Sequence, residues 1–321
     1  MKRRSKGRLP GHAAFVGARS RNAVKRRSAA WLADLGRTGA CLLAVALAAA
    51  CHVVVPPARV VAHAEPAPTT PAQAWDLFDR ILDVHVDQSG RVNHAALARD
   101  PRALERLYLW LAHTSPAASP EAFPSRADAL AYWINAYNAL VLVSVSRHWP
   151  IASVAEVPSP RLVGLVSDTA GFFHVDRFVL GGEPHSLQSL REDVIRERFA
   201  DPRVHFALAT GTRGSPGLAR RSFRGADLDP RLDAVTQVFL AREEALRIDA
   251  AGHAVVVSAI FSQYSNDFAT APAAQGSVLG WLAENAPTAE RPTLERARER
   301  NWPLRSAPWD PRLDPSPSLT P

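Results

Sequence analysis

The longest apolar run of the chain lies near its middle. Residues 129–145 contain almost no polar side chain, and Ser125 with Asp128 three residues later forms a start that resembles a capping box. A helix that is apolar on every side is normally surrounded by other elements, so the pattern predicts a buried central helix. Its two amides, Asn135 and Asn138, share one face. Since an unsatisfied buried polar group costs about 1–3 kcal/mol, we expect both amides to hold a neighbouring loop or strand.

Shorter segments repeat apolar residues at the spacing of one helix face. Two of them also have start signals, because Asp100-Pro101 precedes one and Ser186 precedes another. The predicted helices include residues 75–82, 104–111, 187–195 and 232–239. They give the central helix several partners to pack against.

Strand patterns occur in three places. β-type residues at 172–180 lead into Gly181-Gly182 and a return stretch to Ser186, which predicts a hairpin. Apolar residues alternate with other side chains at 204–209, which predicts a second strand, and residues 253–258 predict a third. The mixture predicts an α+β fold in which the central helix packs on a mostly antiparallel sheet that contains residues 204–209.

The first 64 residues have the order of an export signal. A basic stretch through Arg27 precedes an apolar run at 39–50, and small residues then offer cleavage points. Leu47-Ala-Ala-Ala-Cys51 resembles a lipoprotein signal in which Cys51 is acylated, whereas Ala62-His63-Ala64 fits ordinary signal cleavage. An uncleaved anchor is a third alternative. We therefore expect an exported protein that is periplasmic, secreted or anchored to the membrane as a lipoprotein.

Charge and cysteine content restrict the partners and chemistry of the remainder. The formal net charge of +7 originates in residues 1–64, because the rest of the chain carries more acidic than basic residues. The sequence therefore favours no nucleic-acid partner and membrane contact only through the N-terminal segment. Both cysteines, Cys41 and Cys51, lie in that segment. The folded part thus has no disulfide, thiolate metal site or cysteine nucleophile.

Composition divides the chain after this targeting segment (residues 1–64) into three parts. Residues 65–73 are rich in Pro, Thr and Ala and are predicted to be a linker. Residues 74–305 are predicted to form one globular domain. Residues 306–321 are rich in Pro and polar residues and are predicted to be a disordered tail.

Ordered sequence blocks resemble one protein family. The run Ala131-Tyr-Trp-Ile-Asn-Ala-Tyr-Asn-Ala-Leu140 resembles the hallmark helix of the bacterial and plant family called domain of unknown function 547. Residues 186–196, 201–208 and 264–268 resemble further family segments in the same order, and residues 301–304 resemble its C-terminal motif. The resemblance implies a fold similar to papain-like and transglutaminase-like proteins. It implies no assigned activity.

Two departures from the family pattern bear on catalysis. Relatives commonly carry Cys-x-Ser-x-Ser-Cys-Pro in the loop after their His-Phe-Ala-Leu segment, where this chain has Thr210 and Ser215. Their Glu-His pair in the preceding helix is replaced by Arg191-Glu192. If relatives use a Cys/His pair for acyl transfer, this chain has lost both members.

Three residues are candidates for catalysis. His205 precedes a glycine-bearing loop, where functional groups are often displayed, and the alternative is a structural histidine that bridges strand and loop. Ser215 is a nucleophile only if a base lies within hydrogen-bond reach, and Arg213-Gly-Ser-Pro-Gly217 lacks the first glycine of a G-x-S-x-G elbow, which favours a turn serine. Asp267 either orients His205 as an acid partner or pairs with Arg203.

Further polar and aromatic residues near the family motifs are candidates for substrate binding. They are Asn135, Tyr137, Asn138, Arg203 and Tyr264, with structural hydrogen bonding as the alternative for the first three. His174, His185 and His205 lack the spacing of metal ligands, and no phosphate-binding or dinucleotide-binding loop occurs. The sequence therefore predicts no metal and no cofactor.

Two functions of different classes remain open. The favoured one is an exported cell-envelope binding or scaffold protein that has lost a papain-like nucleophile. The alternative is a hydrolase or acyl-transfer enzyme that acts on peptide or amide bonds through Ser215 and His205. In either case the expected partner is a peptide, a cell-wall component or a protein of the envelope.

Overall fold

The computed structural model describes residues 53–57, 66–160, 167–272 and 274–314. All of them belong to one compact unit, His52–Pro321. The lipidation candidate Cys51 and the rest of the targeting segment apart from residues 53–57 lie outside the described part of the chain.

Helix α5 (Arg126–His148) lies in the larger apolar core. The expected capping box is present: the Ser125 hydroxyl accepts from the Asp128 backbone, and the Asp128 carboxylate accepts from the Ser125 backbone. Every residue from Leu130 to Val145 is buried, which confirms the prediction of a buried central helix. Among the described helices α5 alone is long and apolar enough to span a membrane. Since 89% of that stretch is buried inside the domain, it serves as a core helix.

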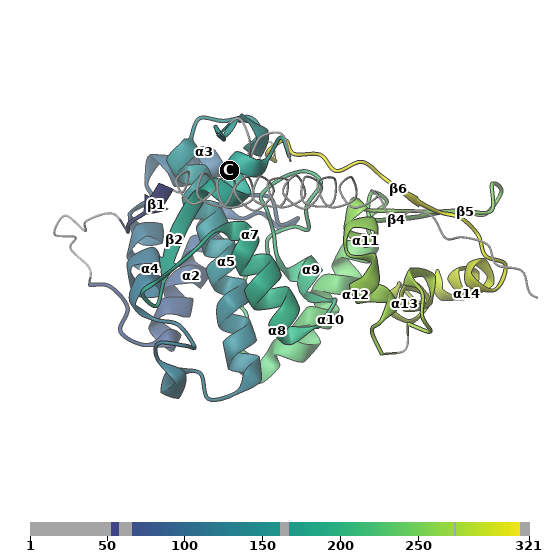
Figure 1. Cartoon of the computed structure of the whole chain (residues 1–321), viewed down its shortest axis with the longest axis horizontal. Coiled ribbons are helices and arrows are strands. Elements are labelled where there is room, and N and C mark those ends of the chain that lie inside the picture. Colours follow the sequence, from purple (N-terminus) through teal and green to yellow (C-terminus); the bar gives the residue numbers. More distant parts are fainter. Residues whose placement is uncertain (1–52, 58–65, 161–166, 273, 315–321) are drawn as a thin grey trace, which may run out of the picture. The chain divides into compact units, whose positions relative to one another are not determined.

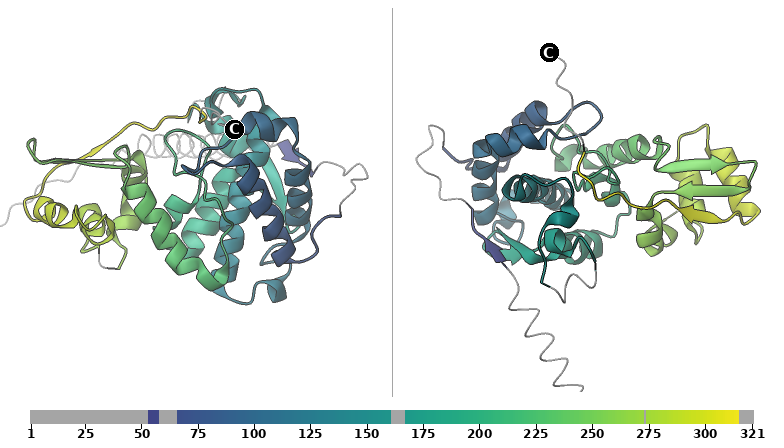
Figure 2. Two further views of the ribbon diagram at one scale, coloured as in Figure 1. Left: turned by 180° about the vertical axis from the view of Figure 1, so that it is seen from behind. Right: turned by 90° about the horizontal axis from the view of Figure 1, so that it is seen from above.

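Other helices enclose α5 (Figures 1 and 2). Helices α2 (Pro71–His85), α3 (His94–Arg99) and α4 (Arg102–His113) pack with it or with one another. Because α2 begins at Pro71, capped by the Thr70 side chain, the helix reaches into the segment expected to be a linker.

A continuous helical run after Ser186 packs on another part of α5. It consists of α7 (Leu187–Ser189), the π-helical η4 (Leu190–Arg196) and α8 (Glu197–Phe199). The Ser186 hydroxyl accepts from the backbone of Ser189, as a helix cap should. This run occupies the predicted helix at 187–195 and carries much of the candidate site.

The strands of the described residues form two small three-stranded sheets. In the first, β1 (Val53–Val55) is parallel to β2 (Asp176–Leu180), which pairs antiparallel with β3 (Glu183–His185) through the expected turn. In the second, β4 (Leu246–Asp249) is antiparallel and β6 (Leu304–Ser306) parallel to β5 (Ala254–Val257). Mixed helices and sheets confirm the α+β class. In place of a mostly antiparallel sheet that contains residues 204–209, the described residues form these two sheets, each with one parallel and one antiparallel pair.

Residues 204–209 do not form the predicted strand. Val204–Ala207 form one helical turn, α9, and the chain then becomes extended at Leu208. All residues from 204 to 210 are buried, so alternation along this segment says nothing about which side faces a core. Asp201 accepts a hydrogen bond from the backbone of Arg203 and thereby favours a turn at the start of the segment. A similar difference occurs at Gly171–Val175, where the π-helical η3 replaces the first half of a predicted strand.

A smaller apolar core lies between the second sheet and the C-terminal helices (Figure 2). Phe206 of α9 belongs to this core, whereas its neighbours Val204 and Ala207 belong to the core around α5. Helix α9 therefore lies where the two cores meet. The remaining helices are α10 (Leu228–Leu240), α11 (Ala259–Gln263), α12 (Ser265–Ala269), α13 (Val278–Asn285) and α14 (Arg291–Glu299), with short 3₁₀ turns η1 (Pro120–Ala122), η2 (Val154–Glu156) and η5 (Gly225–Asp227).

After β6 the chain continues as an extended segment to Asp314, past the expected domain end at residue 305. Backbone hydrogen bonds join it to residues 152–154 and to the loop 211–214. Trp309 lies so close to Gly214 that any side chain at position 214 would collide with the Trp309 ring. The C-terminal segment therefore covers the loop that leads to Ser215.

Candidate functional site

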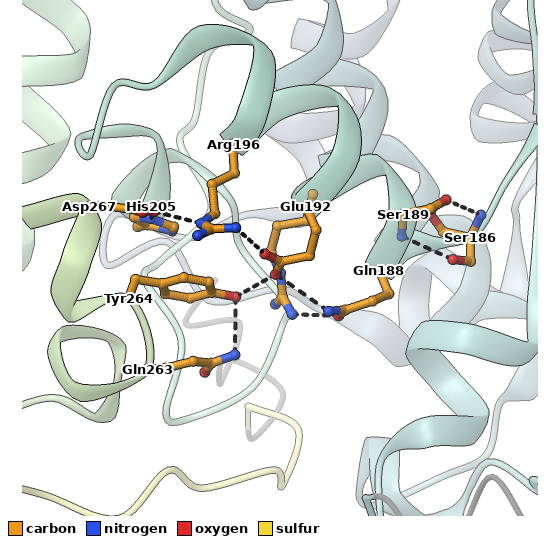
Figure 3. Close-up of polar contacts among 10 residues, drawn as sticks. Ser186, Gln188, Ser189, Glu192, Arg196, His205, Gln263, Tyr264 and Asp267 are labelled. Carbon is orange, nitrogen blue, oxygen red and sulfur yellow. Dashed lines mark hydrogen bonds and ion pairs between the residues drawn. The ribbon is translucent and has the colours of Figure 1, made fainter.

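A histidine on α9 and a carboxylate on α12, from distant parts of the chain, form a hydrogen-bonded pair. His205 Nε2 lies 2.9 Å from Asp267 Oδ2 on α12, and the His205 ring stacks on Tyr264 at 4.0 Å between ring centroids (Figure 3). Because a carboxylate only accepts, the proton of the neutral ring sits on Nε2. The His205 side chain is only 2% exposed, and this burial lowers its pKa even though Asp267 acts to raise it. The ring is therefore neutral near pH 7.

Arg196 links this pair to a second carboxylate. Its Nε donates to Asp267 Oδ2 at 2.7 Å, and its Nη1 donates to Glu192 Oε2 at 3.2 Å. Partial burial acts to raise the pKa of Asp267, but the hydrogen bonds from His205 and Arg196 outweigh it and the pKa is lowered. The Tyr264 hydroxyl donates to Glu192 Oε1 at 2.9 Å and accepts from Gln263. Each of the two carboxylates thus has more than one donor.

Glu192 also accepts a hydrogen bond from a neighbour in its own helical run. Arg191 Nε donates to Glu192 Oε1 at 3.1 Å, and Arg191 Nη2 donates to Gln188 Oε1 at 2.6 Å. Residues 188, 192 and 196 are four apart, and this spacing places their side chains on one face of the run. We call the following eight residues the polar cluster: Gln188, Arg191, Glu192, Arg196, His205, Gln263, Tyr264 and Asp267.

Ser215 is held by the backbone of its own loop. Its Oγ donates to the Pro216 carbonyl at 2.8 Å and accepts from the Thr210 backbone at 2.8 Å, and the residue is 6% exposed. No hydrogen bond joins Ser215 to His205 in the described part of the chain. The structure therefore brings together His205, Asp267 and Tyr264 of the predicted site, and leaves Ser215 in a buried turn.

The two amides of α5 bind backbone. Asn138 Nδ2 donates to the Ala207 carbonyl and its Oδ1 accepts from the Ala209 backbone, both at 2.9 Å. Asn135 holds Phe223 in the same reciprocal way, with both distances 2.8 Å. Each amide fixes one backbone segment to the central helix. This agrees with the expectation that a buried amide is hydrogen-bonded.

The last two candidates for binding differ in their surroundings. Tyr137 is completely buried on α5. Arg203 pairs with three carboxylates, those of Asp201, Asp229 and Asp233, at 2.6–2.8 Å, and Asp267 pairs with Arg196 instead. Arg203 thus anchors the start of α9 to α10 and lies outside the polar cluster.

A cavity of about 350 Å³ opens beside the polar cluster. Its wall includes side chains of two cluster members, Arg196 and Asp267. The lining residues are Arg196, Glu197, Ala200, Asp201, Asn266, Asp267, Thr270, Ala271 and Pro272. Three carboxylates and one guanidinium make the wall predominantly acidic. Within the described ranges no group of three or more His, Cys, Asp or Glu side chains is arranged to hold a metal ion.

Sequence reasoning missed Glu192 and Arg196 as members of a site. A signal was present, since Gln188, Glu192 and Arg196 place three polar side chains four residues apart on a predicted helix that also carries an apolar stripe. Their partners could not be identified in that way, because Tyr264 and Asp267 follow about 70 residues later along the chain.

Comparison with known families gave a match that covers some residues of the polar cluster. A family model described as protein of unknown function, DUF547, matches residues 122–240. Residues 122–240 belong to the DUF547 family. The DUF547 segment contains α5, the helical run from Leu187 to Phe199, α9 and α10, so it supplies one side of the polar cluster, and Tyr264 and Asp267 lie beyond it. The comparisons with curated proteins and with solved structures gave no match.

Proposed function

We propose that this DUF547 protein is an exported cell-envelope protein that binds a ligand at the cavity beside the polar cluster and does not cleave it. The observation that carries the proposal is the hydrogen bonding of Ser215. A serine becomes a nucleophile when a general base is hydrogen-bonded to its hydroxyl. Here the hydroxyl donates its proton to the Pro216 carbonyl, which cannot act as such a base.

The state of His205 supports the same proposal. A general base must reach the proton that it removes, directly or through one water. The buried ring presents Nε2–H to Asp267 and one face to Tyr264. His205 is therefore suited to joining α9 to α12 and to fixing the wall of the cavity.

The lining of the cavity indicates the chemistry of the ligand. Glu197 offers an exposed carboxylate and Asn266 an amide. The carboxylates of Asp201 and Asp267 also lie in the wall, where they already accept from Arg203 and Arg196 respectively. Ligand sites commonly combine a concave surface with a few placed polar groups. A predominantly acidic wall with one cation suits a ligand that carries amino and amide groups. We therefore propose a peptide, or a peptide-bearing fragment of the cell wall, as the ligand.

Export is supported by the sequence of the targeting segment. A basic stretch, an apolar run and small residues follow one another within residues 1–64. An envelope location would place the cavity where cell-wall peptides occur. The papain-like or transglutaminase-like relationship stays a prediction from the family resemblance.

Binding can be tested with a matched pair of variants. Glu197 is an exposed residue of the cavity wall, and Asp193 is an exposed residue one turn earlier on the same run and outside the cavity. Titration calorimetry with soluble peptide-bearing fragments from a peptidoglycan digest should show binding to the wild-type chain. Glu197→Gln should weaken it several-fold, and Asp193→Asn should leave it unchanged. Absence of binding, or equal effects of both variants, would contradict the proposal.

The alternative is a serine hydrolase, and one observation favours it. Asp267 lies where an orienting carboxylate would lie, 2.9 Å from His205. That mechanism requires Ser215 to exchange the Pro216 carbonyl for the His205 ring. Covalent labelling of Ser215 would decide for this alternative, and absence of labelling would decide for binding.

A further inference from the structure

Residues 53–57, which sequence reasoning assigns to the targeting segment, are built into the folded domain. β1 (Val53–Val55) lies parallel to β2 in the register Val53 to Asp176 and Val55 to Phe178, at the edge of the first sheet (Figure 1). Val55 is 6% exposed and belongs to the larger core, whereas its neighbour Val54 is 55% exposed. The strand therefore has one buried and one exposed face, as a packed edge strand does.

Polar groups of the domain also depend on this strand. The buried Tyr108 hydroxyl donates to the Val55 carbonyl at 2.6 Å and accepts from the Val179 backbone of β2 at 3.0 Å. Arg147, near the end of α5, donates to the Pro56 carbonyl at 3.0 Å. Tyr108 thus bridges the two strands from α4, and loss of β1 would leave its hydroxyl proton without this acceptor.

We infer that β1 is a permanent part of the domain, so the exported chain is processed before Val53 and not after Ala64. Cleavage after Ala64 would hydrolyse the peptide bond between Ala64 and Glu65, with the hydroxyl of water added to the new carboxyl terminus and its proton to the new amino terminus. It would free residues 53–57 to leave the sheet. The departure would expose the edge of β2, remove Val55 from the core and remove the acceptor of Tyr108, each of which is unfavourable. Processing before Val53 has none of these consequences. The inference rests on the export part of the proposed function.

The N-terminus of the mature protein tests the inference directly. The full chain is expressed in a bacterium that exports it, and the mature protein is purified and its N-terminal peptide is identified by mass spectrometry. We expect a peptide that contains Val53–Val55, beginning at Cys51 or upstream of it. A mature N-terminus at Glu65 would overturn the inference and leave export standing. An intact Met1 in the cytosol would refute export, and with it the inference about processing.

A pair of substitutions on the two faces of β1 gives a second test. The full chain is made with Val55→Ser or with Val54→Ser, and the melting temperature of each purified mature protein is measured. Val55→Ser should lower it by several degrees, because the buried side chain leaves the core, and Val54→Ser should not change it. Equal melting temperatures for the two variants and the wild type would show that β1 contributes nothing to the mature fold and would overturn the inference.

Discussion

Replacing Asn138 by leucine removes the reciprocal hydrogen bonds that hold α9 to α5. Asn138 is 2% exposed, and its amide satisfies the Ala207 carbonyl and the Ala209 N–H, both of which are buried. Leucine has similar size but can pair with neither group. The variant therefore leaves two buried backbone groups without their partner.

The size of the effect follows from these two groups. Each buried group left unsatisfied costs about 1–3 kcal/mol, so the pair costs about 2–6 kcal/mol. The apolar leucine side chain recovers roughly 1–2 kcal/mol by its burial. The middle of each range, about 4 and about 1.5 kcal/mol, leaves a net loss of about 2.5 kcal/mol, which should lower the melting temperature by about 5–10 °C in a domain of this size.

Thermal unfolding followed by circular dichroism measures the change, with Ser144→Ala as the matched control. Ser144 lies on the same helix, is fully buried, and has a hydroxyl without a hydrogen-bond partner in the described part of the chain. Its removal should leave the melting temperature unchanged or slightly higher. An unchanged melting temperature in Asn138→Leu, or an equal loss in Ser144→Ala, would refute the role assigned to the amide.

Two further predictions concern pH, and they have opposite signs. Burial lowers the pKa of His94 to about 4 from its ordinary value of 6.5, so the unfolded chain binds more protons between these values and stability falls as the pH decreases from 6.5 to 4. The loss should be on the order of 3 kcal/mol. Melting curves at pH 7, 5.5 and 4 should show that His94→Gln removes this part of the acid sensitivity. The same decrease of melting temperature with pH in the wild type and the variant would contradict the prediction. Burial raises the pKa of Asp314 to about 6 from 3.8, so the folded chain binds more protons in that window and stability falls as the pH rises through it. The melting temperature of Asp314→Asn relative to the wild type should therefore increase between pH 4 and pH 7, and a constant difference would contradict the assignment.

The central helix could be predicted from sequence because its signals are local. Ser125 and Asp128 mark the start within one turn, and an apolar run on every side of a helix requires burial. The pairing of Asn135 and Asn138 followed from the cost of an unsatisfied amide. Their backbone partners did not follow, because Phe223 and Ala207 lie 88 and 69 residues away in the sequence.

The segment after Pro202 shows where periodicity loses its meaning. A two-residue alternation predicts a strand only when one face is exposed, and residues 204–210 are buried on all sides between two cores. The four residues of α9 are also too few to show a helical period. The apolar character of Phe206 agrees with its burial, but the predicted strand around it is wrong, because the chain forms a helical turn there.

The candidate site could be predicted only in part, for a related reason. His205 and Asp267 are residue types that pair, and the structure places them 2.9 Å apart. The environment of Ser215 depends on the loop conformation and on the extended segment near Trp309, neither of which has a local sequence signal. The sequence could propose a hydroxyl and a base, but it could not show that the hydroxyl is bonded to backbone.

Labelling with a fluorophosphonate probe tests most directly whether this protein binds or cleaves its ligand. The purified mature protein is incubated with the probe beside the Ser215→Ala variant and a known serine hydrolase as the positive control. We predict that the positive control is labelled and that neither the wild type nor the variant is, because the Ser215 hydroxyl donates to the Pro216 carbonyl and, within the described residues, bonds to no general base. Labelling of the wild type that disappears in Ser215→Ala would contradict the binding proposal.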